Sequence, residues 1–235
     1  MNGQFSGSVV LVAGGTGALG RAVSLAFLEQ GATVAVTFRE PREFDELKGV
    51  AASNAALLQG QQVDVSDEVA MKRFIQTLVA EHGRLDVVVN TVGAFAGGAK
   101  LWEEDAKLLE QMLGANLRSG YAISRAAIPE MLKQKNASFI NIASRAAIDH
   151  TAGIASYAAS KAAAVALMDS LAAELKGTGV RVNSVLPSII DTEANRKAMP
   201  KADFTKWPKP EEIARVILFL ASDDAKLVHG ASIPV

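Results

Sequence analysis

Short apolar runs rich in Val and Ile alternate with longer helical patterns along the whole chain. The runs have few polar positions between their apolar ones, which is typical of strands buried on both faces. We expect strands at 8–13, 33–38, near 56–63, 85–90, 138–143 and 180–186. This alternation predicts an α/β fold built on a single doubly wound parallel sheet, Rossmann-like, with helices on both faces.

Residues that favour helix ends bound several of the stretches between these runs. The first helix is expected to close on Gly31, and a helix with Ser66 as its N-cap should end at Gly83. Pro210 opens the last helix at a first-turn position. No linker, repeat or low-complexity segment divides the chain, so residues 1–235 are expected to form one domain.

Composition and charge narrow the class of function. The 235 residues are 49% hydrophobic and carry a formal net charge of −1, which gives no electrostatic attraction for nucleic acid or an anionic membrane. The absence of cysteine excludes thiolate nucleophiles, and the three histidines have no metal-ligand spacing, so no metal site is expected. No apolar run approaches the ~18 residues of a spanning helix, and no signal peptide is recognisable, so we expect a cytoplasmic protein.

A glycine-rich turn follows the first strand. In "GGTGALG", Gly15, Gly17 and Gly20 fit G-x-G-x-x-G between a strand and a helix, where the dinucleotide fingerprint belongs. Glycine lets the backbone approach a pyrophosphate, and the N–H groups that start the next helix favour an anion. The residues expected to bind a dinucleotide here are Gly14, Gly15, Thr16, Gly17, Ala18, Leu19 and Gly20.

The end of the second strand bears on the choice of cofactor. Folds of this kind that prefer NAD place Asp or Glu there to bond the ribose 2′-hydroxyl, whereas this chain has Phe38 and Arg39. The guanidinium of Arg39 can bind a 2′-phosphate bidentately, which favours NADP(H) over NAD(H). Two alternatives stay open: Arg39 is an ordinary solvated arginine, or Glu40 neutralises it.

Tyr157 and Lys161 stand in a run of small residues, "ASYAASKAAA". Residues four apart in a helix share one face, so the two side chains can point into the same space. A tyrosine titrates near pKa ~10, and a neighbouring positive charge lowers that value. Chance placement on a solvated surface is the alternative; the small neighbours favour a ligand that comes close to this face.

Further motifs stand in a fixed order around this pair. They are the glycine-rich turn, "VDVSD" with Asp64, "VVNTVG" with Asn90, "NLRSG" with Asn116, "NIAS" with Ser144, "YAASK" and "RVNSVLPS". In this order they resemble the short-chain dehydrogenase/reductase family over essentially the whole chain. The chain departs from the usual family residues at Ala13, Ala18, Thr91, Val92 and Ser188, and none of these departures removes a catalytic group.

The resemblance implies catalytic roles for four residues. Tyr157 would give its proton to a carbonyl oxygen as hydride reaches the carbon, and Lys161 would lower the pKa of Tyr157 and bond the nicotinamide ribose. Ser144 would bond the substrate oxygen, and Asn116 would hold a water that links Lys161 to bulk solvent. The resemblance also implies that the Tyr157 helix pairs across a homodimer or homotetramer. Further cofactor contacts that it implies are Asp64, Val65, Asn90, Tyr157, Lys161, Pro187, Ile190 and Thr192.

A narrower resemblance concerns the substrate. "GGTGALG", "VGAFAGGAK" and residues 191–207 are similar to the dihydropteridine reductase branch, which lacks the serine found here as Ser144. Phe95 either stacks on a flat substrate ring or is tucked into the core. Residues 189–208 are expected to be an irregular loop, either a substrate lid or a passive surface loop. The acidic run 103–105 is expected to be the solvated start of a helix.

Three functions follow from these features. The first is an NADP(H)-dependent oxidoreductase that interconverts a carbonyl and an alcohol in a small molecule. The second is reduction of a pteridine or similar ring with the same tyrosine and lysine. The third is a nucleotide-binding sensor without turnover, against which the intact Ser144, Tyr157 and Lys161 argue. No nucleic-acid or membrane partner is expected.

Overall fold

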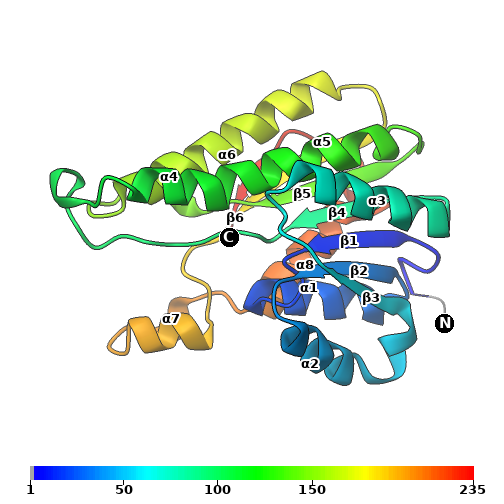
Figure 1. Ribbon diagram of the computed structural model, residues 1–235, viewed down its shortest axis with the longest axis horizontal. Coiled ribbons are helices and arrows are strands. Elements are labelled where there is room, and N and C mark those ends of the chain that lie inside the picture. Colours follow the sequence, from blue (N-terminus) through cyan, green and yellow to red (C-terminus); the bar gives the residue numbers. More distant parts are fainter. Residues whose placement is uncertain (1–2) are drawn as a thin grey trace.

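The computed structural model describes residues 3–235 and contains one parallel sheet with helices on both faces (Figure 1). The strand order is β3-β2-β1-β4-β5-β6-β7, and every neighbouring pair is parallel. The strands are β1 (Val9–Ala13), β2 (Thr33–Phe38), β3 (Leu58–Gln62), β4 (Val87–Asn90), β5 (Ala137–Ile142), β6 (Val180–Leu186) and β7 (Ser232–Pro234). The six predicted strands are confirmed, while β7 was not predicted.

The helices cover the sheet in two layers, which confirms the doubly wound prediction. The apolar core on one face includes residues of α3, α5 and α6, and the core on the other face includes residues of α1, α2 and α8. None of the helices in residues 3–235 is long and apolar enough to cross a membrane. The helices are α1 (Ala18–Glu29), α2 (Pro41–Ala51), α3 (Glu68–His82), α4 (Leu108–Leu113), α5 (Ser119–Met131), α6 (Ala155–Glu174), α7 (Glu193–Ala198) and α8 (Pro210–Ala221).

The helix ends follow the sequence signals with one exception. The N-cap of α3 is Asp67, whose carboxylate accepts hydrogen bonds from the N–H groups of Val69 and Ala70 at 2.9 and 3.0 Å. The predicted cap, Ser66, is wrong because its hydroxyl donates to Asp64 instead. Gly83 ends α3 in the left-handed region, as predicted, and Pro210 opens α8.

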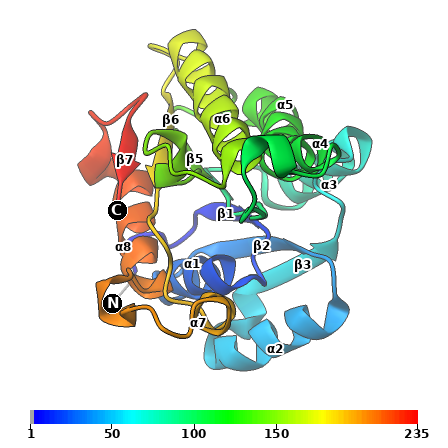
Figure 2. The same ribbon diagram turned by 90° about the vertical axis from the view of Figure 1, so that its left-hand side faces the viewer.

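The carboxyl ends of three strands form one row at an edge of the sheet. Ala13 at the end of β1 lies opposite Asn90 of β4, and Asn90 lies opposite Asn141 of β5. Since β1 lies between β2 and β4, this row contains the switch point at which such sheets bind ligands. The side of the molecule that carries α7 and the start of α4 is on the left in Figure 1 and faces the viewer in Figure 2.

Candidate active site

The glycine-rich turn after β1 forms a cradle that larger residues would fill. A Cβ atom on Gly20 would lie 2.1 Å from the carbonyl oxygen of Gly14, and one on Gly15 would lie 2.4 Å from Val36. Gly14 itself has a φ of +73°. Helix α1 starts directly after Gly17 with no side-chain cap, so the N–H groups of its first turn remain available to an anion. The turn therefore fits the pyrophosphate of a dinucleotide.

Two threonines that the sequence did not identify as site residues hold this cradle in place. The N–H of Gly14 donates to Thr37 Oγ1 at 2.9 Å. The hydroxyl of Thr91 donates to the carbonyl of Ala13 at 2.7 Å, with that of Gly14 at 3.2 Å. Their positions at the ends of the two strands that flank β1 are the signal that could have found them. Thr16, by contrast, turns outward and donates to Glu43 at 2.8 Å.

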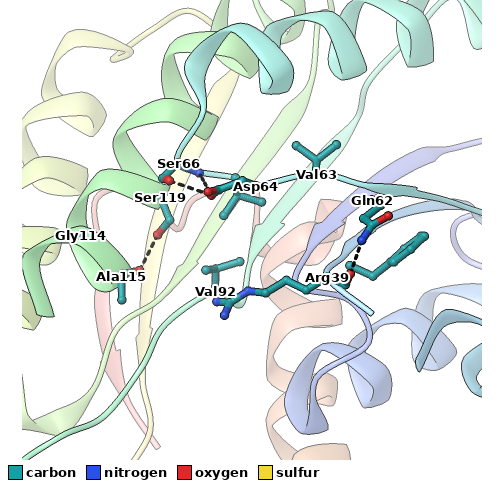
Figure 3. Close-up of a pocket in the computed structure, with 11 residues that line it drawn as sticks. Arg39, Gln62, Val63, Asp64, Ser66, Val92, Gly114, Ala115 and Ser119 are labelled. Atoms are coloured by element: carbon teal, nitrogen blue, oxygen red, sulfur yellow. Dashed lines mark hydrogen bonds between the residues drawn. The ribbon is translucent and has the colours of Figure 1, made fainter. Parts of the chain in front are cut away.

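A pocket of about 490 Å³ lies at the ends of β2 and β3 (Figure 3). Its lining includes the predicted cofactor residues Arg39, Asp64 and Val65, together with Ser119. Within residues 3–235 no ion pair joins Arg39 to Glu40, so the guanidinium is not neutralised in the way considered above. In Figure 3 the guanidinium of Arg39 extends towards Val92.

The pKa of Asp64 is held below its usual value. Hydrogen bonds from the hydroxyl of Ser66 at 2.7 Å and from its N–H at 2.9 Å are the main causes, and the positive charge of Arg39 adds to them. Asp64 is thus a fixed anion with two of its acceptor positions occupied. It lies in the same pocket as Arg39, whose charge it partly balances.

Other predicted cofactor residues have structural partners of their own. The side chain of Asn90 is buried and donates to Asn141 at 2.9 Å, which joins the ends of β4 and β5. Thr192 caps α7 by accepting from the N–H of Asn195. Pro187 and Ile190 follow the end of β6. Contacts of these residues with a cofactor stay predictions.

Lys161 and Tyr157 lie on α6, as predicted, next to the row of strand ends. Lys161 is only 5% exposed, and its ammonium donates to the carbonyl of Ile142 at 3.2 Å. Burial lowers the pKa of Lys161 to about 8. A Cβ atom on Gly93 would lie 3.0 Å from Lys161 Nζ and 2.8 Å from Asn116 Oδ1, so these two polar atoms converge on one point.

The pKa of Tyr157 is shifted in the direction opposite to the prediction. Burial raises the pKa of this phenol, and a hydrogen bond with Ser144 only partly opposes the rise. The predicted lowering by Lys161 is therefore wrong for this structure. The physical reason is that both groups are buried, and burial disfavours the charged forms of the phenol and of the amine alike. The structure does bring Ser144 to Tyr157, as the resemblance implied.

Asn116 lies in a π-helical segment, Gly114–Arg118, between α4 and α5. Its side chain donates to the carbonyl of Ala94 and to Ser160 Oγ, both at 3.0 Å, and accepts from the N–H of Ala94 at 2.9 Å. π-Helical turns of this kind are frequent at functional sites. The side chain fixes the chain after β4 against α6, while the water relay stays a prediction.

Phe95 is exposed beside the phenol. Its ring lies edge-on to the ring of Tyr157, with centroids 4.9 Å apart, and 66% of the residue is accessible. The alternative that Phe95 is tucked into the core is therefore wrong. Aromatic pairs favour this edge-to-face arrangement, which leaves an apolar surface next to the phenol of Tyr157.

Residues 189–208 are more ordered than the sequence analysis expected. The segment contains α7, and Arg196 pairs with both oxygens of Asp191, at 2.5 and 2.7 Å. The guanidinium of Arg196 also lies over the ring of Phe204, which in turn packs against Trp207. The prediction of an irregular loop is wrong because these contacts fold the segment onto itself. In residues 3–235 no group of three or more His, Asp or Glu side chains is placed to hold a metal ion.

Comparison with known proteins agrees with this geometry. Residues 8–203 match the family model described as short chain dehydrogenase. The 3-oxoacyl-(acyl-carrier-protein) reductase FabG of Thermotoga maritima is 32% identical over 99% of this chain and 97% of its own. The meso-2,3-butanediol dehydrogenase of Serratia marcescens is 31% identical over 99% of this chain and 94% of its own. A structure of ElxO with NADP bound superposes with a TM-score of 0.91, at 26% identity, over 97% of this chain and 96% of that one.

The chain belongs to the short-chain dehydrogenase/reductase family. It is an NAD(P)-dependent oxidoreductase of that family with a Rossmann-like fold, and its substrate is a small molecule. This membership argues against the alternative of a sensor without turnover. The comparisons do not single out the dihydropteridine reductase branch.

Proposed function

We propose that the protein is an NADP(H)-dependent oxidoreductase that interconverts a carbonyl and an alcohol, with Tyr157 as general acid and base. The observation that carries this proposal is that the polar atoms of Lys161 and Asn116 converge on Gly93. Lys161 lies on α6, the same helix that brings Tyr157 to Ser144. The cradle before α1 fits the dinucleotide, which supplies the hydride when bound. A cytoplasmic homodimer or homotetramer remains part of the proposal.

The chain's own residues perform the proton chemistry. Because burial raises the pKa of Tyr157, its hydroxyl keeps its proton at neutral pH and can donate that proton to a carbonyl oxygen, which leaves the phenolate behind. Ser144, which interacts with the phenol of Tyr157, would donate a second hydrogen bond to the same oxygen as negative charge develops there. Burial lowers the pKa of Lys161 to about 8, so this ammonium gives up its proton more readily near neutral pH than an ordinary lysine does.

The pocket at the ends of β2 and β3 supports NADP(H) over NAD(H). Arg39 lines this pocket without an ion-pair partner in the described part of the chain, and Phe38 stands where an acid would select NAD. A guanidinium in this position can make charge-assisted bonds to a 2′-phosphate. The cofactor preference is thus assigned to Arg39.

A flat ring substrate, such as a pteridine, is the second candidate. The exposed ring of Phe95 at the site favours it, because an aromatic face stacks well on a planar ring. One assay separates the candidates: purified protein is offered NADPH with a panel of ketones and with a quinonoid dihydropterin. Turnover of ketones supports the first function, turnover of the dihydropterin alone supports the second, and turnover of neither contradicts both.

A further inference from the structure

Two polar side chains that the mechanism does not use meet at the start of α6. The hydroxyl of Ser156, the residue before Tyr157, donates to one carboxylate oxygen of Glu104. Ser156 is only 5% exposed, and the second oxygen of Glu104 is buried with no hydrogen-bond partner among residues 3–235. The prediction that the acidic run 103–105 is simply solvated is therefore wrong for Glu104.

Helix α6 has no capping side chain of its own. Ile154 stands at its N-cap position and provides no side-chain hydrogen bond, and the first turn contains no acidic residue. A carboxylate near the N-terminus of a helix interacts favourably with the helix dipole. Glu104, 52 residues earlier in the chain, places a carboxylate at this first turn, where it accepts a hydrogen bond from the Ser156 hydroxyl.

The segment that ends in Glu104 touches the active site along its length. Ala94 binds Asn116 through both of its backbone groups, and the ring of Phe95 rests against Tyr157. The N–H of Gly98 donates to the carbonyl of Gly153 at 2.7 Å, just before α6 begins. Figure 1 shows this connection from β4 running to the left-hand end of the molecule before α4 starts. The hydrogen bond between Glu104 and Ser156 is the last of these contacts along the segment.

We propose that Glu104 is a positioning residue for the reaction, which acts through its bond to Ser156 to hold the first turn of α6, and with it Tyr157, against segment 93–104. This inference rests on the proposed function, since it concerns where the proton donor stands relative to substrate. What α6 needs from Glu104 is the hydrogen-bond acceptor. A neutral amide can supply that acceptor, and it also avoids burying a charged oxygen without a partner.

The test compares four variants in the full-length protein. Glu104→Ala and Ser156→Ala each remove the hydrogen bond. The double variant removes the same single bond, and Glu104→Gln keeps an acceptor for Ser156. Glu103→Ala is the matched control, because Glu103 is the exposed neighbour of Glu104 and makes none of these contacts. For each variant, kcat and KM are measured with the best ketone or alcohol of the panel, and the dissociation constant of the nucleotide is measured by calorimetry.

We expect kcat to fall about tenfold in Glu104→Ala and in Ser156→Ala, well inside the ~100-fold that a 1 Å displacement of a reacting group can cost. The double variant should be no slower than either single one, because coupled residues are not additive. Glu104→Gln should recover most of kcat, and the nucleotide should bind all variants alike. In Glu104→Ala, hydrogen exchange should rise at residues 94–104 and 153–158.

Several outcomes would overturn the inference. These are a Glu104→Ala enzyme that matches Glu103→Ala, additive losses in the double variant, or a Glu104→Gln enzyme as slow as Glu104→Ala. If Glu104→Ala does not fold, Ser156→Ala still removes the same bond with a smaller change of volume. If the unaltered protein turns over no substrate, the proposed function fails; unchanged hydrogen exchange in Glu104→Ala then defeats the positioning role as well.

Discussion

Lys161 Nζ and Asn116 Oδ1 stand on the same side of Gly93, 3.0 and 2.8 Å from the position that a Cβ atom would take there. The two residues come from different helical segments, α6 and the π-helical turn before α5, and both lie against the backbone after β4. Only a residue without a side chain allows this approach. Gly93 therefore determines where the side chains of Lys161 and Asn116 can lie, although it carries no functional group itself.

Gly93→Ala should displace Lys161 or Asn116 and slow the reaction. We expect kcat to fall by about 10-fold to 100-fold, because a displacement of less than 1 Å at reacting groups has effects of this size. Steady-state kinetics with the best substrate of the panel measure the loss. Gly49→Ala in α2 is the control, because nothing lies within 4 Å of the added methyl group. Equal activity of the two variants would show that the approach to Gly93 does not matter.

Burial of Lys161 predicts a specific dependence of stability on pH. Its pKa is about 8 in the folded protein and 10.5 when unperturbed, so the unfolded chain binds the proton more tightly. This group therefore destabilises the fold below pH 8, and the penalty disappears as pH rises through the window from 8 to 10.5. Lys161→Met, which cannot titrate, lacks this dependence.

Urea denaturation at pH 7 and at pH 10.5 measures the effect in both proteins. The free energy of unfolding of the unaltered protein relative to Lys161→Met should rise by about 3 kcal/mol between these pH values, at 1.36 kcal/mol per pKa unit. The comparison with Lys161→Met cancels the titration of the other groups. A constant difference between the two proteins would mean that the ammonium is not desolvated by the fold.

Arg39 should decide between the two nicotinamide cofactors. Arg39→Gln should weaken binding of NADPH by about 10-fold to 100-fold, since a hydrogen bond to a charged group contributes about 1.5–3 kcal/mol. NADH, which has no 2′-phosphate, should bind as before. Calorimetry measures both constants, and Arg42→Gln on the exposed start of α2 is the control. Tighter binding of NADH than of NADPH by the unaltered protein would contradict the assignment.

Arg181 should stabilise the fold without taking part in the reaction. Its buried guanidinium donates to the carbonyls at the end of α8, those of Leu220, Ala221, Ser222 and Ala225, at 2.6–3.3 Å. Arg181→Met leaves buried carbonyls without partners and should cost about 2–3 kcal/mol of unfolding free energy. Thermal denaturation compares it with the exposed Arg215→Met. A melting temperature equal to that of the control would show that the carbonyls find other partners.

The sequence predicted well what depends on local pattern. Runs of β-branched residues located five of the six longer strands, and the glycine spacing located the cradle, because each signal lies within a few residues of its effect. The strand β3, Leu-Gln-Gly-Gln-Gln, has no such run and was placed only approximately. The strand β7 was not predicted because its three residues, Ser-Ile-Pro, carry no such pattern. At the start of α3 either Ser66 or Asp67 could cap the helix. Asp67 is the cap because the hydroxyl of Ser66 is bonded to Asp64 instead.

What depended on tertiary packing could not be predicted. The sequence placed Tyr157 and Lys161 on one helix face but not the depth of their burial, which reverses the expected shift in the pKa of Tyr157. The bond between Glu104 and Ser156 spans 52 residues and leaves no local trace. The edge-on contact of Phe95 with Tyr157 likewise arises from the path of the chain after β4.

The central claim is that Tyr157 hands its proton to a substrate oxygen beside a bound nicotinamide. Oxidation of NADPH by the best carbonyl substrate, followed by the absorbance of the reduced nicotinamide for the unaltered protein and for Tyr157→Phe, tests it most directly. Loss of the proton donor should lower kcat by about 10²–10⁴-fold, with the dissociation constant of NADPH changed by less than about 2-fold. An unchanged kcat in Tyr157→Phe would contradict the account.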